Sequence, residues 1–159
     1  MSGIAIVTFQ RHLAPAFRRL NLDWIERLFK VEPPDLKVLD DPESAIIATG
    51  GMILFALEGE TPVGTVAMIR VDARRYELAK MGVASTHQRR GIGEKLAATG
   101  IAWARAAGAG TVFLETNSKL ANAIRLYERL GFRHATHPHP SDYARSDVYM
   151  ELPITGSGS

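Results

Sequence analysis

Hydrophobic residues recur along this chain with two different spacings. Near the start, Leu13, Phe17, Leu20 and Trp24 follow one another at intervals of three or four residues, the spacing of one helix face. Elsewhere, short runs of β-branched and apolar residues end at glycine, proline or aspartate, as strands do. The pattern predicts helices at 12–29, 41–47, 94–107 and 120–130, and strands at 4–9, 51–58, 63–72, 76–84, 111–116, 132–135 and 148–152.

The order of these elements favours one α/β domain without an internal repeat. A length of 159 residues fits a single domain with its own hydrophobic core. We assign this domain to residues 1–153 and expect the Gly- and Ser-rich residues 154–159 to form a flexible tail. The proline- and aspartate-rich segment 32–42 is expected to be a turn, and Asp41 is expected to cap the short helix that follows.

Residues 88–93 read Gln-Arg-Arg-Gly-Ile-Gly and lie between a predicted strand and a predicted helix. Glycine lets the backbone approach a ligand closely, and the first turn of a helix offers unpaired N–H groups to an anion. Arg89, Arg90 and Lys95 add positive charge nearby. A Walker loop is excluded because its sequence does not occur, and a dinucleotide fingerprint because Leu96 stands in place of its third glycine. The loop is therefore predicted to bind a pyrophosphate, with a plain strand-to-helix turn as the alternative.

A second motif follows the predicted strand at 111–116. Its characteristic residues are Asn122, Tyr127, Gly131 and Phe132. Together with the glycine loop, this pattern resembles the GNAT superfamily of acyl-CoA-dependent N-acyltransferases, over roughly residues 4 to 151. The resemblance implies a mixed, mainly antiparallel sheet flanked by helices, in which a pair of strands splays apart near Met81 to admit the thioester.

The resemblance also implies roles for individual residues, with acetyl-CoA as the co-substrate. Tyr127 becomes the candidate general acid that protonates the departing thiolate, although its helical spacing alone favours an ordinary packing residue. The backbone N–H of Met81 would hold the acetyl carbonyl, Val83 would pair with pantetheine, and Asn122 would contact the cofactor from its helix. The expected cofactor-binding residues are Met81, Val83, Gln88, Arg89, Arg90, Gly91, Ile92, Gly93, Glu94, Lys95 and Asn122.

Acetylation of an amine by direct attack requires a neutral amine, so a base or a water relay must remove a proton from the ammonium form. Glu77 and Glu115 are the candidate bases, because each lies in a predicted strand that should border the cofactor. The alternatives are a solvent-facing carboxylate for Glu77, and an ion pair with Arg125 or Lys119 for Glu115. The two-residue period of a strand places on one face Glu77, Ala79, Met81 and Val83.

Composition excludes several classes of function. The formal net charge of +2 is too small to predict nucleic-acid binding. The chain has no cysteine, which excludes a thiol nucleophile and leaves direct attack by the acceptor. It has no apolar run of membrane-spanning length and no signal-peptide pattern, so we expect a cytoplasmic protein without a membrane partner. His134, His137 and His139 are interrupted by prolines and lack helical spacing, so we expect no metal site.

The acceptor is predicted from the segment 134–147, which occupies the place where this superfamily varies its acceptor pocket. Tyr143 and Arg145 are the candidate substrate-binding residues, since a guanidinium forms a planar bidentate pair with a carboxylate. Alternatively, Arg145 pairs internally with Asp142 or Asp147.

We therefore expect an N-acetyltransferase that acts on the primary amine of a small metabolite or amino-acid-like acceptor. A protein lysine or N-terminal acetyltransferase and a non-catalytic acyl-CoA sensor are the alternatives. A homodimer is compatible with the resemblance, because dimers are frequent in the superfamily.

Overall fold

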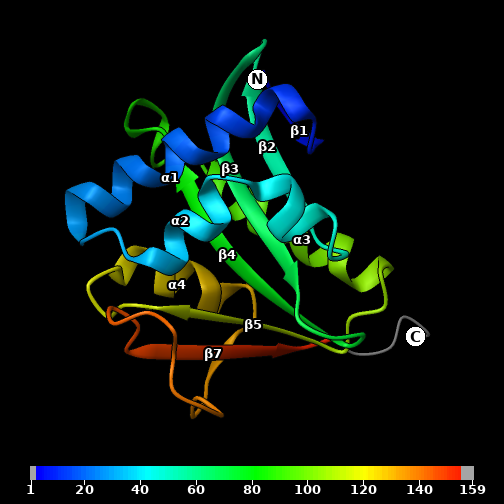
Figure 1. The fold of residues 1–159 in the computed structure, drawn as a ribbon, viewed down its shortest axis with the longest axis vertical. Coiled ribbons are helices and arrows are strands. Elements are labelled where there is room, and N and C mark those ends of the chain that lie inside the picture. Colours follow the sequence, from blue (N-terminus) through cyan, green and yellow to red (C-terminus); the bar gives the residue numbers. More distant parts are fainter. Residues whose placement is uncertain (1–2, 155–159) are drawn as a thin grey trace.

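The computed structural model describes residues 3–154, which form one seven-stranded sheet (Figure 1). Its strands are β1 (Ile4–Thr8), β2 (Met52–Glu58), β3 (Thr61–Arg70), β4 (Arg75–Val83), β5 (Thr111–Thr116), β6 (Arg133–His134) and β7 (Val148–Pro153). They lie in the order β1-β2-β3-β4-β5-β7-β6. The β4–β5 pair is parallel and the other pairs are antiparallel, which confirms the predicted mixed, mainly antiparallel sheet.

Helices cover both faces of this sheet. They are η1 (Arg11–Leu13), α1 (Ala14–Leu28), α2 (Pro33–Leu39), η2 (Glu43–Ile47), η3 (Ser85–His87), α3 (Ile92–Ala106) and α4 (Ala121–Arg129). α1 and α2 pack on one face, in front in Figure 1, whereas α3 and α4 pack on the other. The longer predicted helices are confirmed with ends that differ by a few residues.

The predicted turn at 32–42 is wrong, because the segment contains α2. Pro33 and Pro34 occupy the first turn of this helix, where a missing N–H removes no helical hydrogen bond. The carboxylate of Asp35 reaches back and accepts the backbone N–H of Glu32 at 2.8 Å. The short helix after Asp41 is present, but it has π geometry.

Alternation along the central strands divides the core into two clusters. Ile53 and Phe55 of β2 face α1 and join one cluster, and Leu54 faces α3 and joins the other. α3 lies very close to the sheet, because Gly100 leaves room for Met68; a Cβ at Gly100 would lie 2.8 Å from the Met68 sulfur. Both faces of the sheet are therefore sealed by helices.

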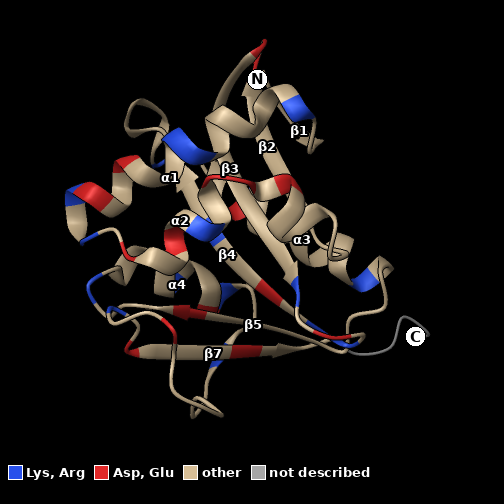
Figure 2. Cartoon of the chain, viewed as in Figure 1, with Lys and Arg blue, Asp and Glu red and all other residues tan. Residues whose placement is uncertain are grey.

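The end of the described chain lies against this core. Ile154 is buried, and its N–H donates to the carbonyl of Gly110 at 2.9 Å. The expected flexible tail therefore begins at least one residue too early, and its remainder, 155–159, lies outside the described residues. Acidic and basic residues are interspersed along the ribbon (Figure 2). No helix of the described residues is long and apolar enough to cross a membrane.

Candidate active site

A groove opens where β4 and β5 part. The two strands pair only over Arg75–Glu77 and Thr111–Phe113, and beyond these residues each continues without the other. The splay predicted near Met81 is thus present and begins just after Glu77. The groove has a volume of about 790 Å³ and is bordered by the two strands, the 88–91 loop, α3, α4 and the C-terminal end of α1. This size is within the usual range of cofactor sites, roughly 300–1,000 Å³.

The glycine loop forms one end of the groove with an unusual backbone. Arg89 and Gly91 both have left-handed backbone angles, with φ of 65° and 77°, and Gly91 is the residue before the first turn of α3. Alternating backbone handedness turns successive N–H groups toward a common point, which suits an anion. The unpaired N–H groups of the α3 first turn face the same end. The loop and helix residues that line the groove are Gln88, Arg89, Gly91, Ile92, Gly93 and Glu94.

Two of the expected cofactor residues lie outside the groove lining. The guanidinium of Arg90 is 3.8 Å from the carboxylate of Glu58. The ammonium of Lys95 donates to the backbone carbonyl of Ile4 at 3.3 Å. Their charges therefore contribute to the region around the loop without a direct contact in the groove.

The prediction that one face of β4 carries Glu77, Ala79, Met81 and Val83 is wrong. β4 has a bulge: between the pairs Thr65↔Gly82 and Ala67↔Ala79, β4 advances three residues while β3 advances two. Lys80, with φ of 54°, lies in this bulge. The extra residue reverses the alternation.

The two faces of β4 beyond the bulge can be identified from their contacts. Glu77, Ala79 and Lys80 line a pocket together with Trp24 of α1. Met81 and Val83 instead belong to the α3 side, because their side chains lie 3.8 Å and 3.9 Å from the position of a Cβ at Gly93. The bulge thus directs Glu77 to one side of the sheet, and Met81 and Val83, which are predicted to contact the cofactor, to the other.

α4 supplies the second wall of the groove. Asn122, Leu126 and Tyr127 line it, and the amide oxygen of Asn122 accepts a hydrogen bond from Arg125. Tyr127 is buried and packs edge-on against Phe132, with ring centroids 5.8 Å apart. Burial raises the pKa of the Tyr127 phenol, so the hydroxyl keeps its proton near neutral pH. Tyr127 therefore both packs in the core and borders the groove.

A smaller pocket of about 90 Å³ adjoins the groove on the α1 and α2 side. Both predicted bases line this pocket, and Glu115 lines the groove as well. Burial, reinforced by the nearby charge of Glu115, raises the pKa of Glu77 to about 7. The solvent-facing alternative for Glu77 is therefore wrong.

Glu115 is held by the loop that follows β6. One carboxylate oxygen lies 2.6 Å from the Nε2 of His137, and the other accepts a hydrogen bond from the hydroxyl of Ser141. The alternative partners Arg125 and Lys119 are therefore wrong. These contacts fix the carboxylate at the place where pocket and groove meet.

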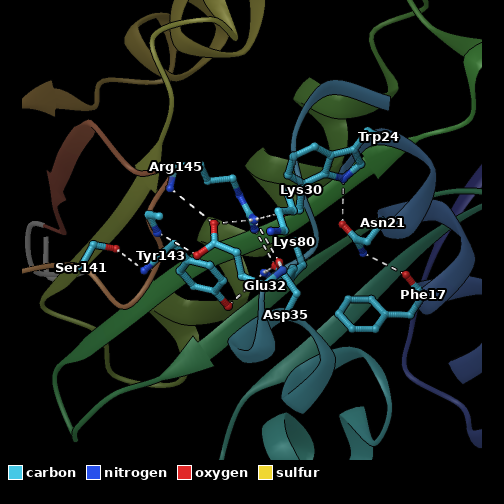
Figure 3. Close-up of polar contacts among 11 residues, drawn as sticks. Phe17, Asn21, Trp24, Lys30, Glu32, Asp35, Lys80, Ser141, Tyr143 and Arg145 are labelled. Atoms are coloured by element: carbon cyan, nitrogen blue, oxygen red, sulfur yellow. Dashed lines mark hydrogen bonds and ion pairs between the residues drawn. The ribbon is translucent and has the colours of Figure 1, made fainter. Parts of the chain in front are cut away.

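Beside the pocket, Figure 3 shows a cluster of charged side chains around Asp35. Asp35 is fully buried and accepts hydrogen bonds from the ammonium of Lys80 at 2.7 Å and from the guanidinium of Arg145 at 2.9 and 2.5 Å. Burial raises the pKa of Asp35, but the hydrogen bonds from Arg145 and Lys80 lower it by more, so that the pKa is about 2. The Tyr143 hydroxyl accepts a hydrogen bond from Lys80 at 3.1 Å.

Arg145 thus pairs internally, but with α2 rather than with the predicted aspartates of its own loop. Its guanidinium also lies 3.4 Å from the carboxylate of Glu32. Asp147 instead accepts hydrogen bonds from the backbone N–H and the hydroxyl of Ser118. Tyr143 and Arg145, the candidate substrate-binding residues, both line the pocket, yet the guanidinium of Arg145 already has carboxylate partners.

The histidines of this loop have separate partners. His134 lies 3.0 Å from a carboxylate oxygen of Glu128, whereas His137 contacts Glu115 and packs against His139 with ring centroids 5.1 Å apart. Within residues 3–154, no group of three or more His, Asp or Glu side chains is arranged to hold a metal ion.

Residues 14–132 match the model of the Acetyltransferase (GNAT) family. The chain belongs to this family. Among GNAT relatives, it is 31% identical over 138 residues to N-acetyltransferase 8 of Homo sapiens, a match that covers 83% of this chain and 60% of that protein. It is 32% identical over 105 residues to the ribosomal protein bS18-alanine N-acetyltransferase of Escherichia coli strain K12, covering 64% of this chain and 71% of that protein.

A solved GNAT structure supports the fold. The phosphinothricin acetyltransferase from Sinorhizobium meliloti, in complex with acetyl-CoA, is similar with a TM-score of 0.78 at 14% identity, over 100% of this chain and 92% of that chain. The chain spans less than two thirds of the length of several curated relatives, between 44 and 66% for four of them.

Several residues of this GNAT site were not found by sequence reasoning. Trp24 lines both cavities, and its indole N–H donates to the buried side chain of Asn21 at 3.0 Å. Asp35 and Lys80 are 45 residues apart in the sequence, and His137 is 22 residues from Glu115, so no local pattern indicates these contacts. The one local signal was Glu32-Pro-Pro-Asp35, a helix start with proline in its first turn.

Proposed function

We propose that this GNAT protein transfers the acetyl group of acetyl-CoA to the primary amine of a small-molecule acceptor by direct attack. The observation that carries the proposal is the junction of the two cavities, where Glu115 lines both the groove and the pocket. An amine in the pocket would reach the groove beside a carboxylate that can take its proton. The acetyl-CoA complex of the similar Sinorhizobium fold supports the donor.

The groove fits this donor at its charged end. The left-handed positions of Arg89 and Gly91 and the first turn of α3 provide backbone N–H groups for a pyrophosphate. Asn122 would contact the cofactor from α4, and Val83 would lie along it from β4. When bound, acetyl-CoA supplies an activated acetyl group and a thiolate leaving group. The backbone N–H of Met81 is the proposed donor to the acetyl carbonyl.

Two proton movements are assigned to side chains. Glu77 or Glu115 removes a proton from the acceptor, and a pKa of about 7 leaves Glu77 part ionised at neutral pH. The Tyr127 hydroxyl gives a proton to the departing sulfur, since its raised pKa keeps it protonated. Tyr143 and Arg145 shape the pocket wall that places the amine.

The proposal is tested by thiol release from acetyl-CoA against a panel of amines, polyamines, amino acids and lysine-containing peptides. The chain has no cysteine, so the protein's own thiols add no background. Acceptor-dependent release at a defined nitrogen, checked by mass spectrometry of the product, supports the transferase. If acetyl-CoA binds but no acceptor is acetylated, an acyl-CoA sensor replaces it.

A protein N-terminal acetyltransferase is the second candidate, because the Escherichia coli relative is named for an alanine of ribosomal protein bS18. Peptides that begin with alanine therefore belong in the same assay. Faster acetylation of such a peptide than of every small amine would favour this candidate. The small volume of the pocket favours the first one.

A further inference from the structure

The acceptor pocket contains two cations whose charges are already balanced. Of the charged residues that line it, Lys80 and Arg145 are basic. Both are hydrogen-bonded to the fully buried carboxylate of Asp35, and Arg145 also lies beside Glu32. The side chains of Lys80 and Arg145 are only 6% and 14% exposed. Two cations opposite two carboxylates leave this cluster without a surplus positive charge.

The remaining charged groups of the pocket lining are carboxyls, Glu77 and Glu115. Glu115 has His137 and Ser141 as partners on the side of the loop. Among the described residues, no side chain or backbone group makes a hydrogen bond to the Glu77 carboxyl. Burial, together with the nearby charge of Glu115, raises the pKa of Glu77 to about 7. A half-buried carboxyl that lines a cavity without a hydrogen-bond partner is suited to a donor on a ligand.

Five large apolar side chains also line the pocket, those of Trp24, Phe29, Val38, Ile69 and Leu120. The polar residues Thr116, Asn117, Tyr143 and Ser146 complete the lining together with Ala79. The volume of about 90 Å³ is smaller than the cavity that accepts benzene, on the order of 150 Å³. The pocket therefore has room for a short alkyl group beside the amine.

We infer that the acceptor of this GNAT protein is a primary amine on a compact apolar body, without a carboxylate close to the amine. The inference rests on the proposed acetyl transfer and narrows its substrate class. The ammonium form of such an amine is attracted to Glu77 and Glu115 and can donate to both. A carboxylate next to the amine of the acceptor would be desolvated beside the carboxyl groups of Glu77 and Glu115. The guanidinium of Arg145, which could have bound this carboxylate, is already paired with Asp35.

The test compares acceptors that differ only in the group next to the amine. Valine, valinamide and isobutylamine share one branched alkyl chain, and the amide keeps the size of the acid while it removes the charge. Each kcat/KM is corrected for the fraction of acceptor that is unprotonated at the assay pH. We expect the corrected kcat/KM of valinamide and of isobutylamine to exceed that of valine by about tenfold or more. One unit charge in a desolvated site has an effect of this order. If the corrected kcat/KM for valine equals or exceeds that for valinamide, the inference is wrong.

Binding of the same three compounds, measured by calorimetry, separates this inference from the proposed function. If valinamide and isobutylamine bind more tightly than valine but none of the three is acetylated, the inference is supported and the transferase proposal is contradicted. If the protein acetylates these compounds and prefers valine, the transferase proposal is supported and the inference is contradicted.

A variant of the charge cluster adds a second arm. Asp35→Asn leaves Lys80 and Arg145 without their central counter-charge, so the ratio of valine to valinamide kcat/KM should rise at least threefold. Glu32→Gln, which removes the more peripheral carboxylate, is the milder variant if Asp35→Asn does not fold. Asp40→Asn, at an exposed ion pair with Arg18, should leave the ratio unchanged. An unchanged ratio in a folded cluster variant overturns the assignment of the cluster to acceptor selection.

Discussion

At the scale of single residues, Glu77 links stability to function because its pKa in the folded protein, about 7, lies above its ordinary value of 4.5. A carboxyl with a raised folded pKa contributes stability that is complete below about pH 4.5 and is lost as pH rises through 7. Glu77→Gln should therefore remove this loss and raise the free energy of unfolding at pH 8 by about 3 kcal/mol. Urea unfolding between pH 4.5 and 8 measures it, and an unchanged pH slope in the variant would contradict the raised pKa.

Tyr127 illustrates how a packing residue and a proton donor can be separated. Tyr127→Phe keeps the ring that packs on Phe132 and removes only the hydroxyl, so kcat should fall roughly 10- to 100-fold with little change in acetyl-CoA affinity. Tyr76, buried against Trp103 and outside both cavities, provides the control. Steady-state kinetics of Tyr127→Phe and Tyr76→Phe decide the matter: equal kcat values in the two variants would make Tyr127 a packing residue.

At the scale of elements, local pattern predicted most of the fold and only part of the site. Element order, the glycine loop and the positions of Glu77 and Glu115 followed from short-range signals. The direction of Met81 did not, because the bulge at Lys80 depends on pairing with β3 and on an ion pair 45 residues away in the sequence. α2 was missed because prolines suggest a turn, although the first turn of a helix tolerates them.

The junction between the 88–91 loop and α3 makes a prediction about the cofactor. Gly91→Glu forces a side chain into a left-handed position, at a cost of about 1 kcal/mol, and places a negative charge where the pyrophosphate is proposed to bind. Acetyl-CoA affinity by calorimetry should fall at least tenfold. Gly108→Glu is the matched control, since Gly108 also has a positive φ and open space but lies beyond the other end of α3. Equal affinity of the two variants would remove the loop assignment.

At the scale of the whole molecule, the Asp35 cluster joins three distant parts of the chain: α2, β4 and the loop before β7. Asp35→Asn leaves two buried cations with one fewer counter-charge and should destabilise the fold by about 3 to 5 kcal/mol. Asp40→Asn, from an exposed pair with Arg18, should change stability by less than about 1 kcal/mol. Chemical denaturation of both variants at pH 7 measures this difference, and similar losses would show that the cluster does not hold the fold together.

The same cluster predicts how the molecule responds to acid. The folded pKa of Asp35, about 2, lies below its ordinary value of 3.8, so its contribution is present above about pH 4 and is lost as pH falls toward 2. Wild-type protein should lose stability over this window, and Asp35→Asn should lose less. Thermal unfolding from pH 5 to pH 2 measures the difference, and parallel curves for the two proteins would contradict the lowered pKa.

The sheet separates the two halves of the proposed reaction, and this separation is itself testable. The 88–91 loop and α3 line the groove on one side of β4, whereas α2 and the Arg145 loop line the pocket on the other, and α1 borders both cavities. Gly91→Glu should therefore weaken acetyl-CoA binding alone, and Arg145→Met should raise the acceptor KM alone, because each changes contacts on one side.

The effects of distant substitutions without shared partners add in free energy to within about 0.5 kcal/mol. The double variant should accordingly show the product of the two separate losses in kcat/KM. A loss much larger or smaller than that product would mean that β4 transmits strain between the two sides of the sheet. The bulge at Lys80 would then be the element that transmits it, because Lys80 contacts Asp35 and borders both cavities.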